Sequence, residues 1–387
     1  MKYKELDFTN FGPVGKGKIK PNKINVFFGS NNSGKSLVAK LIYAINSTDI
    51  STKAVPLKIR QILEESPKNS LSDAYLYSIL RKADISFDDV ISHGMSKCSI
   101  NVKSLHSSMG FVIKTNKSTI PSKLLQLMHF YFNGNRYTNT HDTVYIPAGR
   151  TGIIQTFKQI NDGRNRLLSE LLNAFEGNGT TNADKFTVKS IKNFMQSFRL
   201  PEYLEQFYNL MLLAQVDNLD KNIQKLFSKV FPGKIKIVKT HTGLTQVDYH
   251  DSTGFVTKLE LAGSGVVSWF PISVGMHYVK PNGTLIVEEP EIHLEPFRQL
   301  NLIELLQRTA HEKKVNLIFT THSDYIVKKL LAMVSSKKIK HSDLGLYYFN
   351  RTDNLTNIEQ IDVDKYGEAE QPIFQTAMDE LIREFSI

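Results

Sequence analysis

The stretch that decides the fold reads Gly29-Ser30-Asn31-Asn32-Ser33-Gly34-Lys35-Ser36 and matches the pattern G-x-x-x-x-G-K-[ST] in full. A β-rich apolar run precedes it at 24–28, and apolar residues recur behind it at helical spacing over 37–45. This order predicts a strand, a loop and a helix. A Gly-Ser-Asn-rich turn that only caps a helix is the alternative, but it does not explain Lys35 and Ser36 at this spacing.

Each residue type in this loop suits contact with a polyphosphate. Glycines let the loop fold closely around phosphates, and backbone N–H groups at the helix start face negative charge. Lys35 would reach the β- and γ-phosphates, and Ser36 would ligate magnesium. The sequence therefore predicts an ATP and Mg²⁺ site. The other loop residues expected around the phosphates are Asn31, Asn32, Ser33 and Gly34.

A second apolar strand ends in adjacent acids, in the stretch Thr284-Leu285-Ile286-Val287-Glu288-Glu289-Pro290-Glu291. Carboxylates at the carboxyl end of a strand face the ligand crevice of an open α/β sheet. We expect Glu288 to hold magnesium, directly or through water, and Glu289 to act as general base on the attacking water. Paired acids in a solvated loop are the alternative when this stretch is considered without the phosphate loop.

A third apolar run, at 315–321, ends in His322. A histidine at the end of a parallel strand can donate a hydrogen bond to a γ-phosphate and so report its presence. A lone histidine is more often structural. The position of His322, 34 residues beyond Glu288, favours a place in the site.

Strands and helices alternate in the second half of the chain. The pattern predicts a helix near 264–279, a strand at 284–287, a helix near 295–312 and a strand at 315–320. Such alternation predicts a largely parallel sheet covered by helices.

The length of 387 residues favours one large α/β domain with an insertion, or two packed lobes. A mixed pattern with a helical stretch near 74–83 precedes a strand at 142–147, and polar-apolar helical segments follow over about 155–230. Residues 234–261 alternate like a hairpin. We expect four parts. Residues 1–50 would form a first part with the phosphate loop, and 51–140 a mixed α/β lobe. Residues 141–233 would form an inserted mainly helical lobe, and 234–387 a last part with the acids and His322.

Together these motifs resemble the ABC/SMC-type ATPase head of the RecF and OLD kind, and most of all the stand-alone AAA-family ATPases of bacterial anti-phage defence. The resemblance includes the opening Asn10-Phe11-Gly12-Pro13, the phosphate loop (Walker A), the Walker B and D-loop stretch 289–296 and the switch-histidine stretch 320–325. It implies an α/β ABC-type P-loop head with a mixed, largely parallel sheet and an inserted helical lobe.

Two further stretches match this group more loosely. Leu261-Ala262-Gly263-Ser264-Gly265-Val266-Val267-Ser268 resembles the signature motif, which binds the γ-phosphate held by a partner copy, although it departs from L-S-G-G-Q. Ser264 and Gly265 would open a helix aimed across a dimer interface; a plain Gly-rich helix start is the alternative. Val144 to Gly152 resembles a "YIPAxRxG" stretch, which makes Arg150 a candidate phosphate-sensing or interface arginine. A surface arginine after a turn is the alternative.

The resemblance implies a homodimer or higher homo-oligomer in which two heads meet head to tail around ATP. Phosphoryl transfer then depends on assembly, because part of each site comes from the partner. Most Walker B motifs place Asp where this chain has Glu288, whose longer side chain favours a water-mediated metal contact and slow hydrolysis. Slow hydrolysis suits a switch better than a motor.

The role outside ATP hydrolysis is less constrained. Asp362-Val363-Asp364 has the spelling of a TOPRIM metal pair, but the short stretch after His322 favours an ordinary strand end. The leading hypothesis is a regulatory ATPase that senses phage infection or nucleic acid and controls a separate effector, such as a nuclease. A RecF-like DNA-binding ATPase of repair is the second, and an ABC transporter subunit a third, disfavoured by the poor signature.

Composition limits these hypotheses further. The net charge of +10 and pI near 9.3 permit contact with nucleic acid. No apolar run approaches the roughly 20 residues of a membrane span, so we expect no membrane partner. Cys98 is the single cysteine, and the first residues lack an apolar signal region. These features favour the cytoplasm.

Overall fold

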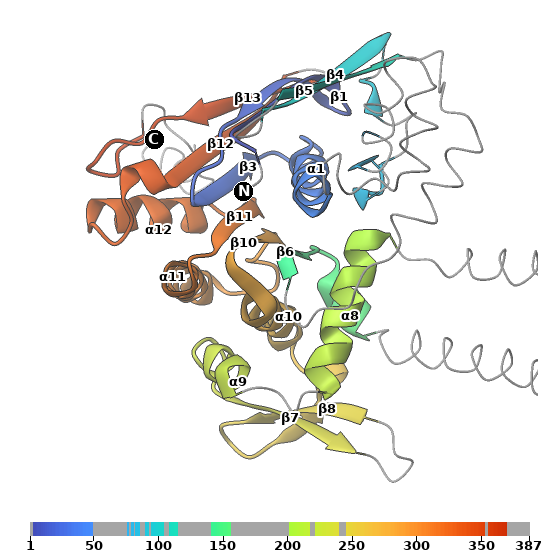
Figure 1. Ribbon diagram of the computed structural model, residues 1–387. Helices are drawn as coiled ribbons and strands as arrows, with labels where there is room; N and C mark the ends of the chain where they lie inside the picture. The colour runs from blue at the N-terminus through green and yellow to red at the C-terminus, as the bar shows by residue number, and fades with distance from the viewer. Residues whose placement is uncertain are drawn as a thin grey trace, which may run out of the picture.

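One large mixed sheet organises the molecule, with strand order β5-β4-β1-β2-β13-β12-β3-β11-β10-β6 (Figure 1). The structure is a computed structural model. It describes residues 3–48, 76, 79–80, 82–85, 90–92, 94–103, 108–114, 141–155, 201–216, 221–239, 245–352 and 355–369.

Neighbouring strands in one half of this sheet run parallel. In spatial order they are β12 (Leu344–Thr352), β3 (Ile24–Gly29), β11 (Asn316–Thr321), β10 (Val279–Glu288) and β6 (His141–Ile146). Parallel strands share one carboxyl edge, so the residues that follow β3, β10 and β11 come together there. The phosphate loop, the acids at 288–289 and His322 are these residues, which confirms the predicted mixed, largely parallel sheet of an α/β fold.

The other half of the sheet contains the antiparallel pairs. β12 pairs with β13, β2 pairs with β1, and β4 extends the sheet from β1 to β5. Only the β13–β2 pair is parallel here. The strands β4 and β5 therefore join the expected 51–140 lobe to the main sheet. Their bounds are β13 (Leu355–Ile361), β2 (Val14–Ile19), β1 (Glu5–Phe11), β4 (Lys97–Lys103) and β5 (Ser108–Lys114).

Alternate side chains of the parallel strands divide the core into two layers. Phe27, Ile286 and Ile318 pack in the layer of α1 (Lys35–Ser47). Val26, Leu285 and their neighbours pack in the layer on the opposite side of the strands. The helices of that layer are α10 (Ser264–Tyr278), α11 (Pro296–Lys313) and α12 (Asp324–Ser335). The helix α1 thus begins beside the carboxyl edge.

The edge strand β6 is covered by α8 (Glu202–Val216). Gln206 donates to the Thr143 carbonyl at 2.7 Å and accepts from the Tyr145 N–H at 3.3 Å, so its amide satisfies backbone groups of the sheet edge. Beyond α8 and α9 (Lys221–Ser228) lies a small antiparallel sheet (Figure 1). Its strands are β7 (Gly233–Lys239), β8 (Thr245–Asp251) and β9 (Val256–Lys258).

The predicted elements of the last part are confirmed: the hairpin is β7 and β8, and the two later helices and strands are α10, β10, α11 and β11. Parts of the remaining expectation lie outside the described residues. These are half of the helix near 74–83, the segments 49–75 and 115–140, and the segment 156–200 of the expected insertion. In the described parts of the chain, no helix has both the length and the apolar character needed to cross a bilayer.

Candidate nucleotide site

An open pocket of about 580 Å³ lies at the N-terminus of α1, within the range of small-ligand pockets. It brings the phosphate loop together with Glu289 and His322. The lining residues are Pro13, Asn31, Asn32, Ser33, Gly34, Lys35, Ser36, Leu37, Glu289 and His322. Of the residues that the sequence predicted for the site, Glu288, Arg150, Ser264 and Gly265 do not line it.

The loop needs glycine at both ends. Gly34 has φ of 93°, and a Cβ built there would lie 2.9 Å from side-chain carbons of Pro13 and Val14. Gly29 has φ of 140°, and its Cβ would lie 2.5 Å from the Phe349 carbonyl oxygen. Both positions favour glycine because of the backbone conformation and the close neighbours. The loop therefore folds tightly against the β1–β2 turn and β12.

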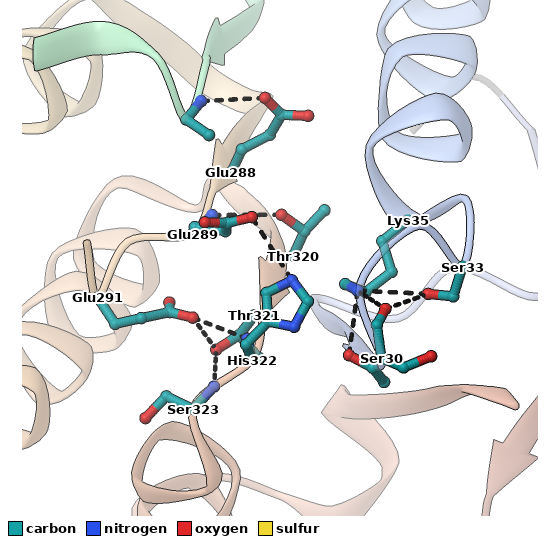
Figure 2. A network of polar contacts seen from close by, with 12 residues as sticks. Ser30, Ser33, Lys35, Glu288, Glu289, Glu291, Thr320, Thr321, His322 and Ser323 are labelled. Atoms are coloured by element: carbon teal, nitrogen blue, oxygen red, sulfur yellow. Dashed lines mark hydrogen bonds and ion pairs between the residues drawn. The ribbon is translucent and has the colours of Figure 1, made fainter. Parts of the chain in front are cut away.

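The Lys35 side chain folds over the loop. Its Nζ donates to the carbonyls of Ser30 at 2.7 Å and Gly29 at 3.1 Å, and to Ser33 Oγ at 3.3 Å (Figure 2). Burial lowers the pKa of Lys35 to about 8, while the charges of Glu289 and Glu291 act in the opposite direction. A polyphosphate in the pocket would offer this ammonium group stronger acceptors than the loop carbonyls.

Glu288 is the last residue of β10 and points to the α1 side of the sheet, as Ile286 does two residues earlier. Its side chain is buried, and Oε2 accepts from the Ala148 N–H at 3.0 Å. The other oxygen, Oε1, is buried without a partner of good hydrogen-bond geometry among the described residues. The Tyr145 hydroxyl lies next to the Glu288 carboxylate. Burial is the main cause that raises the pKa of Tyr145, and the negative charge of Glu288 is the second.

A carboxylate oxygen left in this state fits a magnesium ion or a water bound to one. Ser36, at the start of α1, also lies in the pocket lining. Magnesium usually keeps several waters and takes few protein ligands, so a hydroxyl and one carboxylate are sufficient together with phosphate oxygens. The residues present therefore fit the predicted metal.

Glu289 has a left-handed backbone with φ of 43°, which is uncommon for a residue with a side chain. Its N–H donates to the carbonyl and Oγ1 of Thr320, at 2.9 and 3.2 Å. Its Oε1 lies 3.6 Å from His322 Nε2 (Figure 2). The neighbouring His322 side chain, and to a smaller extent Lys35, lower the pKa of Glu289 despite partial burial. An ionised carboxylate in the pocket has the form that a general base needs.

His322 is held in place by Glu291, which the sequence did not single out as a site residue. Glu291 Oε1 accepts from the His322 N–H at 2.8 Å and from Thr321 Oγ1 at 2.7 Å (Figure 2). Burial raises the pKa of Glu291. The sequence signal that could have indicated Glu291 is its position in the Walker B stretch, two residues after Glu289. Thr320 was missed too, although it belongs to the switch-histidine stretch.

Ser264 and Gly265 lie in the first turn of α10, where Ser264 is exposed and Gly265 is half-buried. Gly265 packs closely there, since a Cβ would lie 2.9 Å from the Phe231 ring and 3.0 Å from the His293 carbonyl oxygen. The helix start thus lies beside the D-loop stretch and outside the pocket of its own chain. Contact of Ser264 with a partner's nucleotide stays a prediction.

Arg150 is not the surface arginine of the alternative, and its expected phosphate-sensing or interface role stays a prediction. Arg150 is 0% exposed, and its guanidinium donates to four backbone carbonyls. The four carbonyls belong to Pro147, Ser268, Glu288 and Glu289, so the structure shows this group bound to the backbone around the Walker B acids. The Asp362-x-Asp364 pair is an ordinary strand end, as expected: Asp364 accepts from the N–H groups of Tyr366 and Glu368 and closes a turn after β13.

Comparison with known proteins finds one matching family model and several similar solved structures. Residues 154–328, slightly less than half of the chain, match the family model described as "AAA domain, putative AbiEii toxin, Type IV TA system". No curated protein matches the chain.

Solved structures of Smc head domains are similar to the chain at 11–12% identity. A Pyrococcus furiosus head with an extended coiled coil, bound to the C-terminal domain of ScpA, covers 100% of this chain and 99% of its own, with a TM-score of 0.46 and 12% identity. The Thermotoga maritima head covers 94% and 100%, with a TM-score of 0.40 and 11% identity. The match to the Pyrococcus yayanosii head covers 100% of this chain and 99% of that head, with a TM-score of 0.44 and 11% identity.

These TM-scores are low, so the assignment depends on the strand order and the phosphate loop of this chain itself. The family model ends before β12 and starts after β6, and it includes the signature, Walker B and switch-histidine stretches. A phosphate loop that opens α1 faces paired acids and a histidine at the carboxyl edge of a mixed sheet. This chain therefore has an α/β fold with a candidate P-loop nucleotide site, and its residues 154–328 match an AAA-domain model, which supports an ATPase.

Proposed function

We propose that this chain is a slow regulatory ATPase that forms ATP-dependent head-to-tail dimers and controls a separate effector in antiviral defence. The main support is one arrangement: the Glu289 and His322 pair lies across the pocket from Lys35 and Ser36. Each group has the chemistry that phosphoryl transfer to water requires.

In this proposal, hydrolysis forms a bond between a water oxygen and the γ-phosphorus and breaks the bond from that phosphorus to the β–γ bridging oxygen. Glu289 orients the water and accepts its proton. Lys35 neutralises charge that develops on the β- and γ-phosphate oxygens, and loop N–H groups at the α1 start do the same. His322 holds the Glu289 carboxylate and lies where a γ-phosphate oxygen would come within reach.

Magnesium would be held by the Ser36 hydroxyl and by Glu288, and when bound it would neutralise phosphate charge. Glu288 already accepts the Ala148 N–H with one oxygen, so a single oxygen is left for the metal or its water. The support for slow turnover is the longer side chain of Glu288 in place of the usual Asp, which favours a metal contact through water.

Dimerisation through α10 is supported by the surface at its start. Leu261 is 72% exposed three residues before Ser264, and Phe297 is 71% exposed at the start of α11, which follows the D-loop stretch. Large apolar side chains at these exposures favour burial against another protein surface. A partner copy would then place its Ser264 at the nucleotide, and ATP would join the two heads.

The defence role is supported by the family description, which names a putative toxin of a toxin–antitoxin system. In this proposal, loss of the γ-phosphate on hydrolysis opens the dimer and changes its contact with the effector. The net charge of +10 favours a second candidate, a RecF-like DNA-binding ATPase. DNA affinity that rises with ATP and falls steeply with salt would support the second candidate.

Three variants test the proposed function. Lys35→Ala should bind no ATP, whereas Glu289→Gln should bind ATP, hydrolyse almost none and remain a dimer by light scattering. Lys340→Ala, an exposed lysine outside the pocket, should match the wild type. Unchanged hydrolysis in the Lys35 and Glu289 variants would refute the site. Co-purification of the Glu289→Gln dimer with proteins encoded next to it tests the effector, and a trapped dimer that binds none of them would count against that part.

A further inference from the structure

Arg150 contacts two parts of the site at once. Its Nη1 donates to the Glu288 carbonyl at 2.8 Å and the Pro147 carbonyl at 3.2 Å, and its Nη2 donates to the Glu289 carbonyl at 3.0 Å. Its Nε donates to the Ser268 carbonyl of α10 at 2.9 Å. One side chain therefore connects both Walker B acids, through their backbone, to the helix that begins at Ser264.

The contact with α10 falls at a weak point of that helix. Pro271 lies inside α10 and has no N–H, so the preceding turn loses a hydrogen bond and tends to bend. Ser268 lies in this turn, one helical turn after Ser264. A displacement of the first turn of α10 would thus reach the Ser268 carbonyl and the guanidinium bonded to it.

The contact with Glu289 falls at a strained residue. Its left-handed backbone costs about 1 kcal/mol or more and persists only where neighbours hold it. Thr320 holds the N–H of Glu289, and its carbonyl accepts from Arg150 and from the Ile292 N–H at 3.1 Å. Ile292 belongs to the same loop, so Arg150 is the contact that joins this carbonyl to a distant element. The orientation of the Glu289 carboxylate depends on these contacts, because the backbone conformation sets where the side chain points.

We propose that Arg150 is a positioning residue that couples the first turn of α10 to the Glu289 carboxylate, so that a contact at Ser264 changes the rate of ATP hydrolysis. This inference rests on the proposed ATPase. It gives a physical link between the surface expected to meet a partner copy and the general base of the same chain.

The chemistry of arginine suits this role. A planar guanidinium has five N–H donors in fixed directions and can bind carbonyls of several elements at once, whereas a lysine ammonium cannot span them. Burial lowers the pKa of Arg150 to about 10, against the charges of Glu291, Glu288 and Glu289, so it stays protonated at neutral pH. Arg150 therefore keeps a positive charge next to the backbone of Glu288 and Glu289.

Trp269 offers a direct measurement of α10. It is the single tryptophan of the chain, follows Ser268 directly and is buried, with its Nε1 bonded to the Phe227 carbonyl at 3.2 Å. Intrinsic fluorescence therefore reports the environment of this turn. We expect Mg²⁺ and ATP to change the fluorescence of the wild-type protein, because the loaded site moves the acids and, through Arg150, the Ser268 turn.

The test compares Arg150→Lys and Arg150→Met with a matched control, Lys313→Met. Lys313 also donates to carbonyls of α10, those of Met276 and His277 at 2.8 and 2.7 Å, but at the far end of the helix. For Arg150→Lys we expect ATP affinity within about 2-fold of wild type, a kcat lower by about 10- to 100-fold, and loss of most of the Trp269 response. The control should keep kcat and the response.

The outcomes separate this inference from the proposed function. A wild-type protein that binds no ATP would refute the proposed function itself. Normal ATP binding in Arg150→Lys with unchanged kcat would overturn only the role of Arg150. An equal loss of kcat in Lys313→Met would also overturn it, because general loosening of α10 would then explain both. Should Arg150→Met fail to fold, the lysine variant gives the same decision.

Discussion

His322 Nε2 lies 3.6 Å from Glu289 Oε1, on the side of the pocket that faces Lys35 (Figure 2). The two residues follow β11 and β10, which are neighbours in the parallel half of the sheet. The neighbouring His322 side chain keeps the pKa of Glu289 below its ordinary value, so the Glu289 carboxylate is ionised at neutral pH. A carboxylate in this state can orient a water and accept its proton, which fits the base role proposed for Glu289.

Removal of the imidazole should therefore reduce the chemical step. In His322→Gln we expect kcat to fall by about 10- to 100-fold, because the Glu289 carboxylate loses a charge-assisted neighbour that fixes it. ATP affinity should change by less than about 3-fold, since His322 is one of many pocket contacts. Steady-state hydrolysis and equilibrium binding measure the two effects. A variant that loses affinity but keeps kcat would contradict the assignment.

Glu291 should act through the same histidine. Glu291→Ala removes the acceptor of the His322 N–H and of Thr321 Oγ1, so the loop after β11 should loosen and kcat should fall. Because both residues affect one group, the effects of Glu291→Ala and His322→Gln should not add in the double variant. Full additivity of the two losses in kcat would show that Glu291 acts elsewhere.

The site residues were predictable where the signal is local. Lys35 and Ser36 follow from a contiguous motif between a strand and a helix, and the acids at 288–289 follow from an apolar strand that ends in charge. Parallel strands share a carboxyl edge, so these segments had to meet. The pocket lining includes the loop and Glu289 but not Glu288.

Arg150 was not predictable because its partners are distant in sequence. The carbonyls of Ser268, Glu288 and Glu289 that it binds lie 118 to 139 residues away. An arginine after a short turn is usually exposed, and nothing in its neighbours indicates burial. The same holds for Thr320, whose bond to the Glu289 N–H depends on the pairing of β10 with β11.

The buried ammonium of Lys35 should make stability depend on pH. The pKa of Lys35 is lowered from 10.5 to about 8 in the folded protein, so between these values the unfolded state binds more protons. Stability contributed by this group therefore rises as pH increases from about 8 to 10.5. Relative to Lys35→Met, the wild type should gain about 1 to 3 kcal/mol between pH 7 and pH 10. Denaturant unfolding at both pH values measures the difference, and a loss of relative stability with rising pH would contradict it.

Gly34 allows a close contact of the phosphate loop with the β1–β2 turn. Gly34→Ala combines a backbone at φ of 93° with a Cβ that would lie 2.9 Å from Pro13 and Val14. Gly254→Ala is the matched control, because Gly254 has φ of 92° but nothing within 4 Å of the added Cβ. Both variants should lose about 1 kcal/mol of stability from the left-handed backbone.

Only Gly34→Ala should lose ATP affinity, by about 10-fold or more, since the loop must move away from the β1–β2 turn to admit the methyl group. Thermal unfolding and nucleotide titration of the two variants separate the backbone effect, which they share, from the contact effect, which they do not. Equal ATP affinity in both variants would mean that the loop adjusts to the methyl group without cost to phosphate binding. The close packing of Gly34 against Pro13 and Val14 would then have no part in shaping the nucleotide site.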